Sequence, residues 1–398
     1  MKKALLVLGG GQDQVFMLKT CKEMGYISVC VDGNPNSPGL KIADYSKPIN
    51  FTEVQNVISY CKHLISKGIN LSGVSTMGSD IPHILSQIAS FFNWIGPSLE
   101  TGEWASHKFK MKNRFIDKNI PVPRFGKVES EKHIDELRKV WGVDKVIIKP
   151  TDRAGSRGVR MICKNDDLNL ALDYARKYSF NNEIILEEFI LGPQISTETI
   201  MYRGVGTTPG FADRVYDYST VFSPMIMENG GWLPSKISEE LYQNICLLVE
   251  SAAKALGIEN GVAKGDVVIC PIRGPLIIEM AARLSGGDFS ESLVPLSKGI
   301  NYVSTVIDIA IGKTPDFKKL IPQKNKVVAN RYFFPPPGNL DDIIGLEKMK
   351  KIPQLKKLDL YVKPKDILPV IDSHNKRAGV FVVVGDDRES VQKIIDYI

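Results

Sequence analysis

The sequence has few of the residues that mark zinc-binding and disulfide-bonded proteins. Its 398 residues include six cysteines and five histidines, and the cysteines are scattered without a Cys-x-x-Cys pair. This spacing offers neither a zinc-binding pattern nor a disulfide framework. We therefore expect a cytoplasmic protein whose thiols stay reduced.

Long hydrophobic runs and basic stretches rich in aromatic residues are absent as well. The N-terminal MKKALLVLGGG has an apolar run too short for a signal peptide, and no apolar span of about 20 residues follows. The net charge of +6 comes from lysines and arginines spread along the chain. We expect a soluble protein that acts on anionic small molecules, without nucleic acid or membrane as a partner.

The chain also lacks internal repeats, so different domains must account for its length. A content of 43% hydrophobic and 24% charged residues is that of an ordinary globular protein. At about 100 to 200 residues per domain, the length predicts roughly two to four domains.

The stretch 264–288 carries the strongest chemical signal. It predicts strands at 266–270 and 276–280, joined by a turn rich in proline and glycine. Asp266 and Glu279 lie on these strands, where carboxylates are costly without a cation. Mg²⁺ fits best, because proteins hold it through one or two carboxylates and substrate phosphates. Arg283 would face phosphate or carboxylate oxygens. A solvent-facing hairpin with a surface arginine is the alternative.

Residues 1 to about 105 read as one α/β unit. A buried strand at 4–8, a turn at Gly9–Gly11 and a helix at 15–24 precede a strand at 26–31 that ends at Asp32. An acidic residue about twenty positions after a glycine turn is typical of dinucleotide sites, but Gln14 takes the place of the third glycine. A structural turn and a substrate-facing loop are the other interpretations.

The loop 73–80 follows another predicted strand in this unit. Ser79 is expected to cap the helix that begins at Ile81. Gly78 and Asp80 are candidates for a substrate pocket, because parallel sheets bind ligands at the carboxyl ends of their strands. Capping alone explains these residues equally well.

A basic helix and a strand that ends in lysine come next. The helix ends near Asn119, and a solvated basic face is its plainest interpretation; its basic residues are Lys108, Lys110, Lys112 and Arg114. Lys149 ends an apolar strand and needs an anionic partner. The glycine loop, residues 151–158, precedes a strand at 159–163 and can lie over phosphates through its backbone N–H groups. It lacks the Gly-Lys-Ser/Thr ending of a P-loop.

The segment 184–193, IILEEFILGP, predicts a strand with an acidic end. Its backbone groups and apolar neighbours suit a planar base, and Glu187 would accept from the exocyclic amine. A plain strand with an acidic end is the alternative.

Taken in this order, the motifs VIIKP with its glycine loop, LEEFILGPQISTET, and KGDVV with IIEMAARLSGG resemble the ATP-grasp ligases. The chain is most similar to the carboxylate-amine ligases that resemble L-amino acid ligases, with biotin carboxylase and the purine-pathway carboxylases as relatives. The resemblance covers nearly the whole chain. It implies an α/β (α+β) fold with a Rossmann-like pre-ATP-grasp domain at 1–105, an ATP-grasp domain at 106–322 with a glycine-loop subdomain at about 121–190, and a small α+β domain at 323–398.

The resemblance also implies the cofactors and the site residues. ATP and Mg²⁺ are expected, with Mn²⁺ as an alternative metal held by Asp266 and Glu279. Arg283 and Lys149 are the implied catalytic residues. The implied ATP-binding residues are Lys108, Lys149, Gly155, Ser156, Arg157, Gly158, Glu187, Glu188, Phe189, Ile190 and Gln194.

Three positions depart from the pattern of the family. Many relatives have glutamate at Gln194 as a ribose contact. Ala281 occupies the asparagine position of an E-x-N-x-R metal motif, so the protein supplies fewer ligands. Gly231 replaces the histidine of an E-x-G-H-x-x-P-S segment. The metal count and the identity of the amine are therefore left open.

The implied reaction joins a small carboxylic acid to an amine through an acyl phosphate, with release of ADP and phosphate. In it, Arg283 and the N–H groups of Ser285, Gly286 and Gly287 would neutralise the acyl phosphate and the later oxyanion. A bicarbonate-activating carboxylase, an NAD-binding oxidoreductase and a binding-only protein are the alternatives, and homodimer formation is left open.

The segment 211–232 is unusually aromatic and is interleaved with charged residues. Its aromatic residues form either the core of a packed flap or the wall of a substrate site. In the second interpretation Arg214 holds an anionic group, and Asp213 or Glu228 holds an ammonium. The C-terminal part predicts a strand at the start of 330–338, a short helical stretch at 340–350, a strand at 380–384 and a helix at 388–398.

Overall fold

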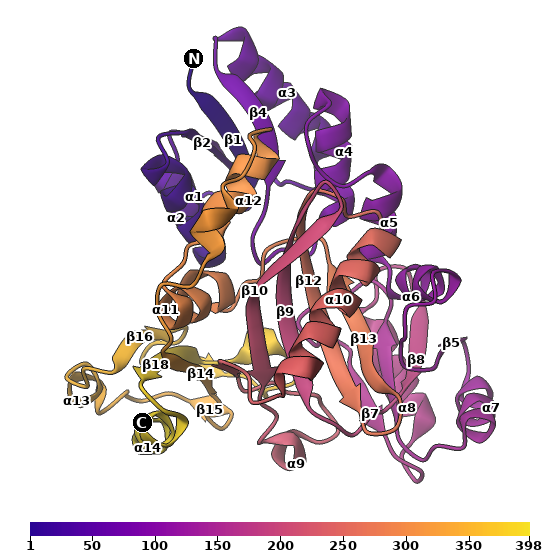
Figure 1. Cartoon of the computed structure of the whole chain (residues 1–398). Helices are drawn as coiled ribbons and strands as arrows, with labels where there is room; N and C mark the ends of the chain where they lie inside the picture. Colours follow the sequence, from indigo (N-terminus) through magenta and orange to yellow (C-terminus); the bar gives the residue numbers. More distant parts are fainter.

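The computed structural model describes all 398 residues. Its N-terminal part is a parallel sheet of four strands in the order β3-β2-β1-β4 (Figure 1). The strands are β1 (Lys3–Leu8), β2 (Ile27–Val31), β3 (Tyr45–Lys47) and β4 (Asn70–Ser75). The helices are α1 (Gln12–Glu23), α2 (Pro38–Ile42), α3 (Val54–Ser66), α4 (Pro82–Phe92) and α5 (Leu99–Ser106).

The apolar run at the N-terminus forms β1 because both faces of this sheet are covered. Ala4 to Leu8 are fully buried, and β1 pairs with β2 on one side and with β4 on the other. The predicted strands and the helix after the glycine turn are confirmed. The prediction that Ser79 caps the next helix is wrong: α4 begins at Pro82, and no side-chain cap precedes it. Proline at the first turn has no N–H to satisfy there.

The centre of the molecule is an antiparallel sheet of eight strands in the order β13-β12-β9-β10-β11-β14-β18-β16. The helix α10 (Glu239–Ala255) packs against its strands β9, β10, β12 and β13. In chain order, the first five strands of this sheet are β9 (Gln194–Tyr202), β10 (Val205–Arg214), β11 (Gly231–Leu233), β12 (Gly261–Cys270) and β13 (Gly274–Ala281). The short helix α9 (Ser219–Phe222) follows β10.

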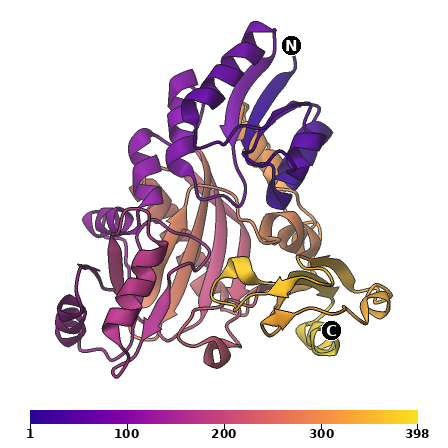
Figure 2. The ribbon, with the colours of Figure 1, turned by 180° about the vertical axis from the view of Figure 1, so that it is seen from behind.

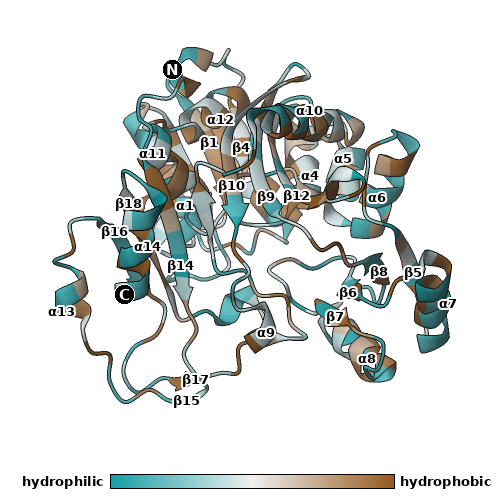
Figure 3. Cartoon of the chain, turned by 60° about the horizontal axis from the view of Figure 1, so that its bottom comes forward, coloured by the Kyte–Doolittle hydropathy of each residue, from teal (hydrophilic) through white to brown (hydrophobic).

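A smaller antiparallel sheet in the order β5-β8-β6-β7 lies beside the central one, together with two helices. We call residues 125–188 the outer unit. Figure 3, a view from below, shows its two helices set apart from β9 and β12. The elements are α6 (Lys108–Asp117), which precedes the unit, β5 (Phe125–Val128), α7 (Glu131–Trp141), β6 (Val146–Pro150), β7 (Arg160–Ile162), α8 (Leu168–Tyr178) and β8 (Ile184–Glu188).

The C-terminal strands extend the central sheet, since β14 pairs with β11. The predicted helical stretch at 340–350 is shorter than expected, because only α13 is helical there. The elements are η1 (Phe289–Leu293), α11 (Val294–Lys298), α12 (Val303–Ala310), η2 (Phe317–Leu320), β14 (Val327–Phe333), β15 (Gly338–Asn339), α13 (Leu346–Met349), β16 (Leu355–Leu360), β17 (Ile367–Leu368), η3 (His374–Lys376), β18 (Gly379–Gly385) and α14 (Arg388–Tyr397).

Two long-range contacts bring distant parts of the chain together. The helix α12 packs on α1 and β4 of the N-terminal sheet, as Figure 1 shows at the top of the molecule. From behind, the C-terminal residues reach toward the outer unit (Figure 2), where the N–H of His374 donates to the carbonyl of Gly155 at 3.1 Å. None of the helices combines the length and the apolar character that a membrane crossing requires.

Candidate active site

A cavity of about 920 Å³ lies where these parts meet. The N-terminal loops, β12 and β13, the glycine loop and the C-terminal segment 374–377 all contribute to its lining. Every residue that the sequence singles out for ATP, metal or substrate lines this cavity except Gly158. The tertiary structure therefore gathers predicted residues from Lys108 to Gly287 in one place.

The hairpin β12–β13 sets Asp266 directly opposite Glu279. Cross-strand partners point to the same face, so both carboxylates are directed into the cavity. The Asp266 carboxylate is already surrounded by donors: Lys264 Nζ lies 2.5 Å from Oδ2, and Arg214 Nη1 lies 3.2 Å from Oδ1. Burial by itself raises the pKa of Asp266, but Arg214 and Lys264 outweigh it and lower that pKa.

Glu279, the second carboxylate of the pair, contacts the first residue of α6. Lys108 Nζ lies 3.0 Å from Glu279 Oε1 and donates to the carbonyl of Arg153 at 2.6 Å. Burial alone lowers the pKa of Lys108, but Glu279 outweighs burial and raises it. Lys108 is therefore not part of a solvated basic face. It links Glu279, a predicted metal ligand, to the loop that follows β6.

Glu187 lines the cavity, and its carboxylate contacts two lysines. It is buried at 3% exposure, with Oε1 2.8 Å from Lys149 Nζ and 3.2 Å from Lys112 Nζ. Its carboxylate is therefore engaged by two ammonium groups, and a contact with an exocyclic amine would compete with them. Lys149 has the carboxylate partner that its apolar strand requires.

Sequence reasoning missed Lys112, which is fully buried on α6. Burial lowers its pKa to about 8, although Glu187 acts in the opposite direction. Lys112 lies one helical turn after Lys108, so the sequence spacing already places both lysines on the same face of the helix. This spacing is the feature from which the burial of Lys112 beside Lys108 could have been predicted.

The glycine loop lies over the cavity and is held from two sides. Ser156 Oγ donates to the carbonyl of Ile226 at 2.7 Å, and Gly155 accepts from His374 of the C-terminal segment. Both Gly155 and Ser156 have positive φ. The loop lines the cavity, and its contact with phosphates stays a prediction.

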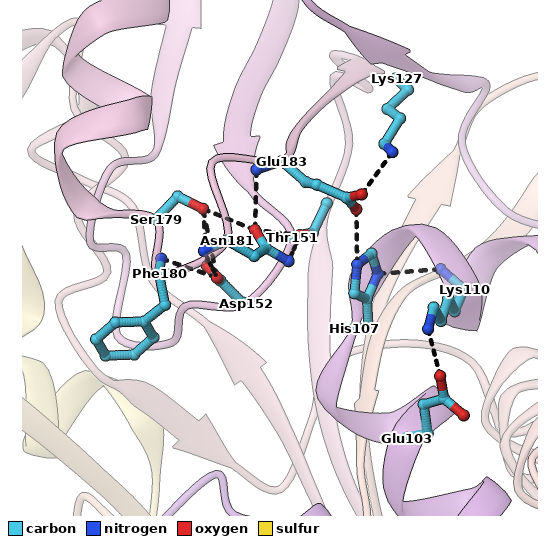
Figure 4. A network of polar contacts seen from close by, with 10 residues as sticks. All are labelled: Glu103, His107, Lys110, Lys127, Thr151, Asp152, Ser179, Phe180, Asn181 and Glu183. Atoms are coloured by element: carbon cyan, nitrogen blue, oxygen red, sulfur yellow. Dashed lines mark hydrogen bonds and ion pairs between the residues drawn. The ribbon is translucent and has the colours of Figure 1, made fainter.

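A polar network behind this loop fixes its start (Figure 4). Asp152 accepts from the N–H groups of Phe180 and Asn181 at 2.8 and 2.9 Å. His107, just before α6, contacts Glu183 at 2.8 Å, and Glu183 also contacts Lys127 at 2.6 Å. These bonds tie the outer unit to α6, which carries Lys108.

The segment after β8 keeps only part of the predicted base-binding groups free. The Glu188 side chain is held by Arg124 at 2.7 Å and by Arg273, and its backbone N–H donates to the carbonyl of Arg124 at 3.0 Å. The N–H of Phe189 donates to the carbonyl of Lys145, whereas the N–H of Ile190 has no protein acceptor. The side-chain oxygen of Gln194 accepts from the hydroxyl of Tyr216 at 3.0 Å.

Arg283 binds the N-terminal unit. Its Nε and Nη2 donate to the two carboxylate oxygens of Asp80 at 2.7 and 2.9 Å. Burial lowers the pKa of Arg283, but Asp80 outweighs it and raises that pKa. The candidate pocket residue Asp80 thus fixes the orientation of the Arg283 guanidinium through two hydrogen bonds.

The predicted oxyanion donors in the tail 285–287 are mostly engaged. The N–H of Ser285 donates to buried Glu198, and the N–H of Gly287 donates to Asp13 at 3.2 Å. Gly286 is the one residue of the three whose N–H has no protein acceptor. The three-donor arrangement expected from the sequence is therefore reduced to one free N–H.

The aromatic segment 211–232 divides between the core and the cavity. Phe211 and Trp232 are buried, so the packed-flap interpretation holds for them. Arg214 faces the cavity, where its Nη2 lies 2.6 Å from Glu228 Oε2. Asp213 instead contacts Arg388 of α14 at 2.6 Å, so each of the two carboxylates proposed for a substrate ammonium is already paired with an arginine.

Glu228 lies in a strongly cationic environment. Burial raises its pKa, but Arg214 and Arg377 outweigh burial and bring the pKa to about 2. His374, also missed from the sequence, lies beside it: its Nε2 accepts from the N–H of Glu228 at 3.5 Å. Burial, followed by Arg377, lowers the pKa of His374 to about 3, so the imidazole stays neutral.

The glycine turn after β1 does not leave Asp32 free for a ribose. The carboxylate of Asp32 accepts from the N–H of Gly10 at 2.7 Å and from the N–H of Asn34 at 2.7 Å. Both bonds are internal to the loops that follow β1 and β2. This arrangement is what the structural-turn interpretation predicts.

The cavity thus combines a strand lysine, a glycine loop and a carboxylate hairpin. Residues 105–287 match the family model of the ATP-grasp domain. The chain contains an ATP-grasp domain. Residues 331–398 match a second model, L-amino acid ligase C-terminal domain 2. Together these matches confirm the resemblance and the fold class that the sequence predicts.

Known ligases are among the relatives of this ATP-grasp chain. Alanine–anticapsin ligase of Bacillus subtilis is 24% identical over 60% of this chain and 54% of its own length. A protein of Sinorhizobium fredii without assigned function is 24% identical over 83% of this chain and 67% of its own length. The crystal structure of L-amino acid ligase from Bacillus licheniformis superposes with a TM-score of 0.84 at 20% identity, over 99% of this chain and 97% of the other. The ATP-grasp domain and these ligase relatives together support an ATP-dependent ligase.

The residues present fit a magnesium ion and ATP phosphates. Asp266 and Glu279 offer hard carboxylate oxygens on one face, and no cluster of three or more histidine, cysteine or acidic side chains is arranged to hold a metal alone. Two protein carboxylates with phosphates and water are what Mg²⁺ accepts. Lys108, Lys149 and the glycine loop lie around the same cavity and suit the phosphates.

Proposed function

We propose that this ATP-grasp ligase joins a small carboxylic acid to an amine through an acyl phosphate. A carboxylate oxygen attacks the γ-phosphorus of ATP, the bond to the bridging oxygen breaks, and ADP leaves. The amine nitrogen then attacks the acyl carbon, and phosphate departs with the C–O bond electrons. The amine proton passes to phosphate or to solvent.

The chain's own residues carry this reaction by positioning and by charge. Lys108, Lys149 and the glycine loop hold the phosphates, and the loop excludes water that would hydrolyse the acyl phosphate. Asp266 and Glu279 would hold Mg²⁺, which neutralises charge on the transferred phosphoryl group. Arg283, oriented by Asp80, faces the acyl phosphate together with the free N–H of Gly286.

One observation carries this proposal: the cross-strand pair of Asp266 and Glu279 lies in the same cavity as Arg283 and Glu228. The pair suits phosphoryl transfer, and Glu228 supplies an anion for an amino group at the same place. The match of residues 331–398 to an L-amino acid ligase domain supports an amine acceptor over bicarbonate.

The experiment is a screen for Mg-ATP-dependent phosphate release. L-amino acids are supplied in pairs, and a parallel reaction contains bicarbonate without any amino acid. We expect turnover with amino-acid pairs and ADP as the nucleotide product. Turnover with bicarbonate alone would replace the proposal by a carboxylase, and AMP with pyrophosphate would refute the acyl-phosphate route.

Two variants test the site itself. Arg283→Ala and Glu279→Ala should lower turnover by about 10² to 10³, the usual effect of losing one charge contact to a transition state. Glu389→Ala, on exposed α14, is the matched control and should keep full turnover. Normal turnover in either site variant would show that the assignment is wrong.

A further inference from the structure

The face of the hairpin β12–β13 that carries the two predicted metal ligands, Asp266 and Glu279, also carries a lysine, Lys264. In the hairpin β12–β13, Asp266 is opposite Glu279, and Lys264 is opposite Ala281. Side chains two positions apart on a strand share a face, so these four residues form one block that faces the cavity. The block therefore contains two carboxylates, one ammonium and one methyl group.

The ammonium of Lys264 forms an ion pair with the carboxylate of Asp266. Lys264 Nζ lies 2.5 Å from Asp266 Oδ2, and its side chain is 17% exposed. The other oxygen, Oδ1, is 3.2 Å from Arg214 Nη1 and 3.3 Å from Ser196 Oγ. Both oxygens of Asp266 are thus in contact with donors of the protein itself.

Glu279 is different, because one of its oxygens is unengaged. Lys108 contacts Oε1 at 3.0 Å, and Oε2 has no protein partner. Ala281 offers no oxygen or nitrogen beside it. The block therefore offers a metal ion one free carboxylate oxygen, which belongs to Glu279, and the oxygens of Asp266, which the ion would share with protein donors. With phosphate and water ligands, these are sufficient for one hexacoordinate Mg²⁺.

We propose that Lys264 supplies the positive charge that a second metal ion would otherwise supply, so that this site takes one divalent cation with its nucleotide. An ammonium is a compact charge with three N–H donors. One donor contacts Asp266, and two are left for phosphate oxygens. A second dication beside Lys264 and Arg214 would be repelled and would find no third protein ligand. The proposal rests on ATP use at this site but not on which acid and amine are joined.

The competing explanation is that Lys264 only neutralises Asp266 and leaves the metal count unchanged. The two explanations differ in the number of ions bound, which can be counted without turnover. The probe is Mn²⁺ titrated into the full chain with saturating AMP-PNP, and free Mn²⁺ is followed by electron paramagnetic resonance. We expect one Mn²⁺ per nucleotide-bound molecule of the wild-type chain.

The decisive variant is the double substitution Lys264→Met with Ala281→Asn. It removes the ammonium and adds an amide oxygen at the facing position, so we expect two Mn²⁺ ions. Lys264→Met alone should keep one ion and weaken AMP-PNP binding about tenfold, the usual effect of one charge-assisted contact. Lys254→Met, on the exposed face of α10, is the control and should change neither value.

Two bound Mn²⁺ ions in the wild-type chain would overturn the proposal. One ion in a double variant that keeps the wild-type circular dichroism would also overturn it, because Lys264 would then not exclude the second ion. Binding of AMP-PNP without any bound Mn²⁺ would also overturn the proposal. A count of one, rising to two in the double variant, would support the proposal even if no acid and amine gave turnover, an outcome that would refute only the proposed ligase reaction.

Discussion

The contact between Glu228 and Arg214 gives a prediction about stability that can be worked out from the structure. The substitution Glu228→Gln keeps the shape of the side chain and removes its charge. The pKa of Glu228 is about 2 in the folded chain against 4.5 for the free side chain. Each unit of difference corresponds to about 1.4 kcal/mol, so the charged form contributes about 3 kcal/mol to the free energy of unfolding at neutral pH.

The sign of the pH dependence follows from the lowered pKa. Because the folded-state pKa lies below the unfolded value, the contribution is complete above pH 4.5 and is lost as the pH falls toward 2. At pH 3 about 1.4 kcal/mol of it should remain. The difference between wild type and Glu228→Gln should therefore shrink by roughly half between pH 7 and pH 3.

The assay is urea unfolding followed by circular dichroism at both pH values. Arg214 keeps Asp266 as a partner at 3.2 Å, so the variant leaves no isolated buried cation and should fold. Glu389→Gln is the control: it breaks an exposed i,i+4 pair with Lys393 and should cost less than about 0.5 kcal/mol. A destabilisation below about 1 kcal/mol, or one that is equal at both pH values, would refute the reasoning.

Two further predictions concern packing and the nucleotide site. A Cβ at Gly73 would lie 2.0 Å from the carbonyl oxygen of Ala310, so Gly73→Ala should push α12 off β4 and cost about 1 to 3 kcal/mol in thermal unfolding; an unchanged Tm would contradict this packing. Lys149→Met removes one of the two cations on Glu187 and the phosphate contact that we propose, so AMP-PNP should lose most of its protection against heat unfolding. Lys110→Met, in an exposed pair, should keep that protection, and equal protection in both variants would count against the nucleotide role of Lys149.

Local chemistry allowed much of the scaffold to be predicted from the sequence. The hairpin at 264–288 follows from two short apolar runs around a turn rich in proline and glycine. The register at this turn would place Asp266 opposite Ile278, and only an irregularity between Asp266 and Val267 shifts it so that Asp266 pairs with Glu279. The first strand, its glycine turn and the helix after it follow equally from neighbouring residues. The order of the motifs along the chain was sufficient to indicate the ATP-grasp family.

The partners of the charged side chains were decided by the tertiary structure alone. Nothing near Glu187 in sequence indicates that Lys112 and Lys149 meet its carboxylate. The same holds for Asp80, which orients an arginine about two hundred positions later. A buried charge takes whichever counter-charge the fold brings within about 4 Å, and sequence spacing does not limit that choice.

The connection between the parts of the chain also depended on long-range packing. The sequence predicts β14 and β18 as strands, but only pairing with β11 makes them part of the central sheet. Likewise His374 reaches the cavity because the C-terminal segment folds back onto the glycine loop. The backbone N–H and C=O groups that a strand offers to a neighbour are the same for every sequence except at proline, so they carry no information about which edge the strand will join. The sequence therefore determined the elements, and the tertiary structure determined their neighbours.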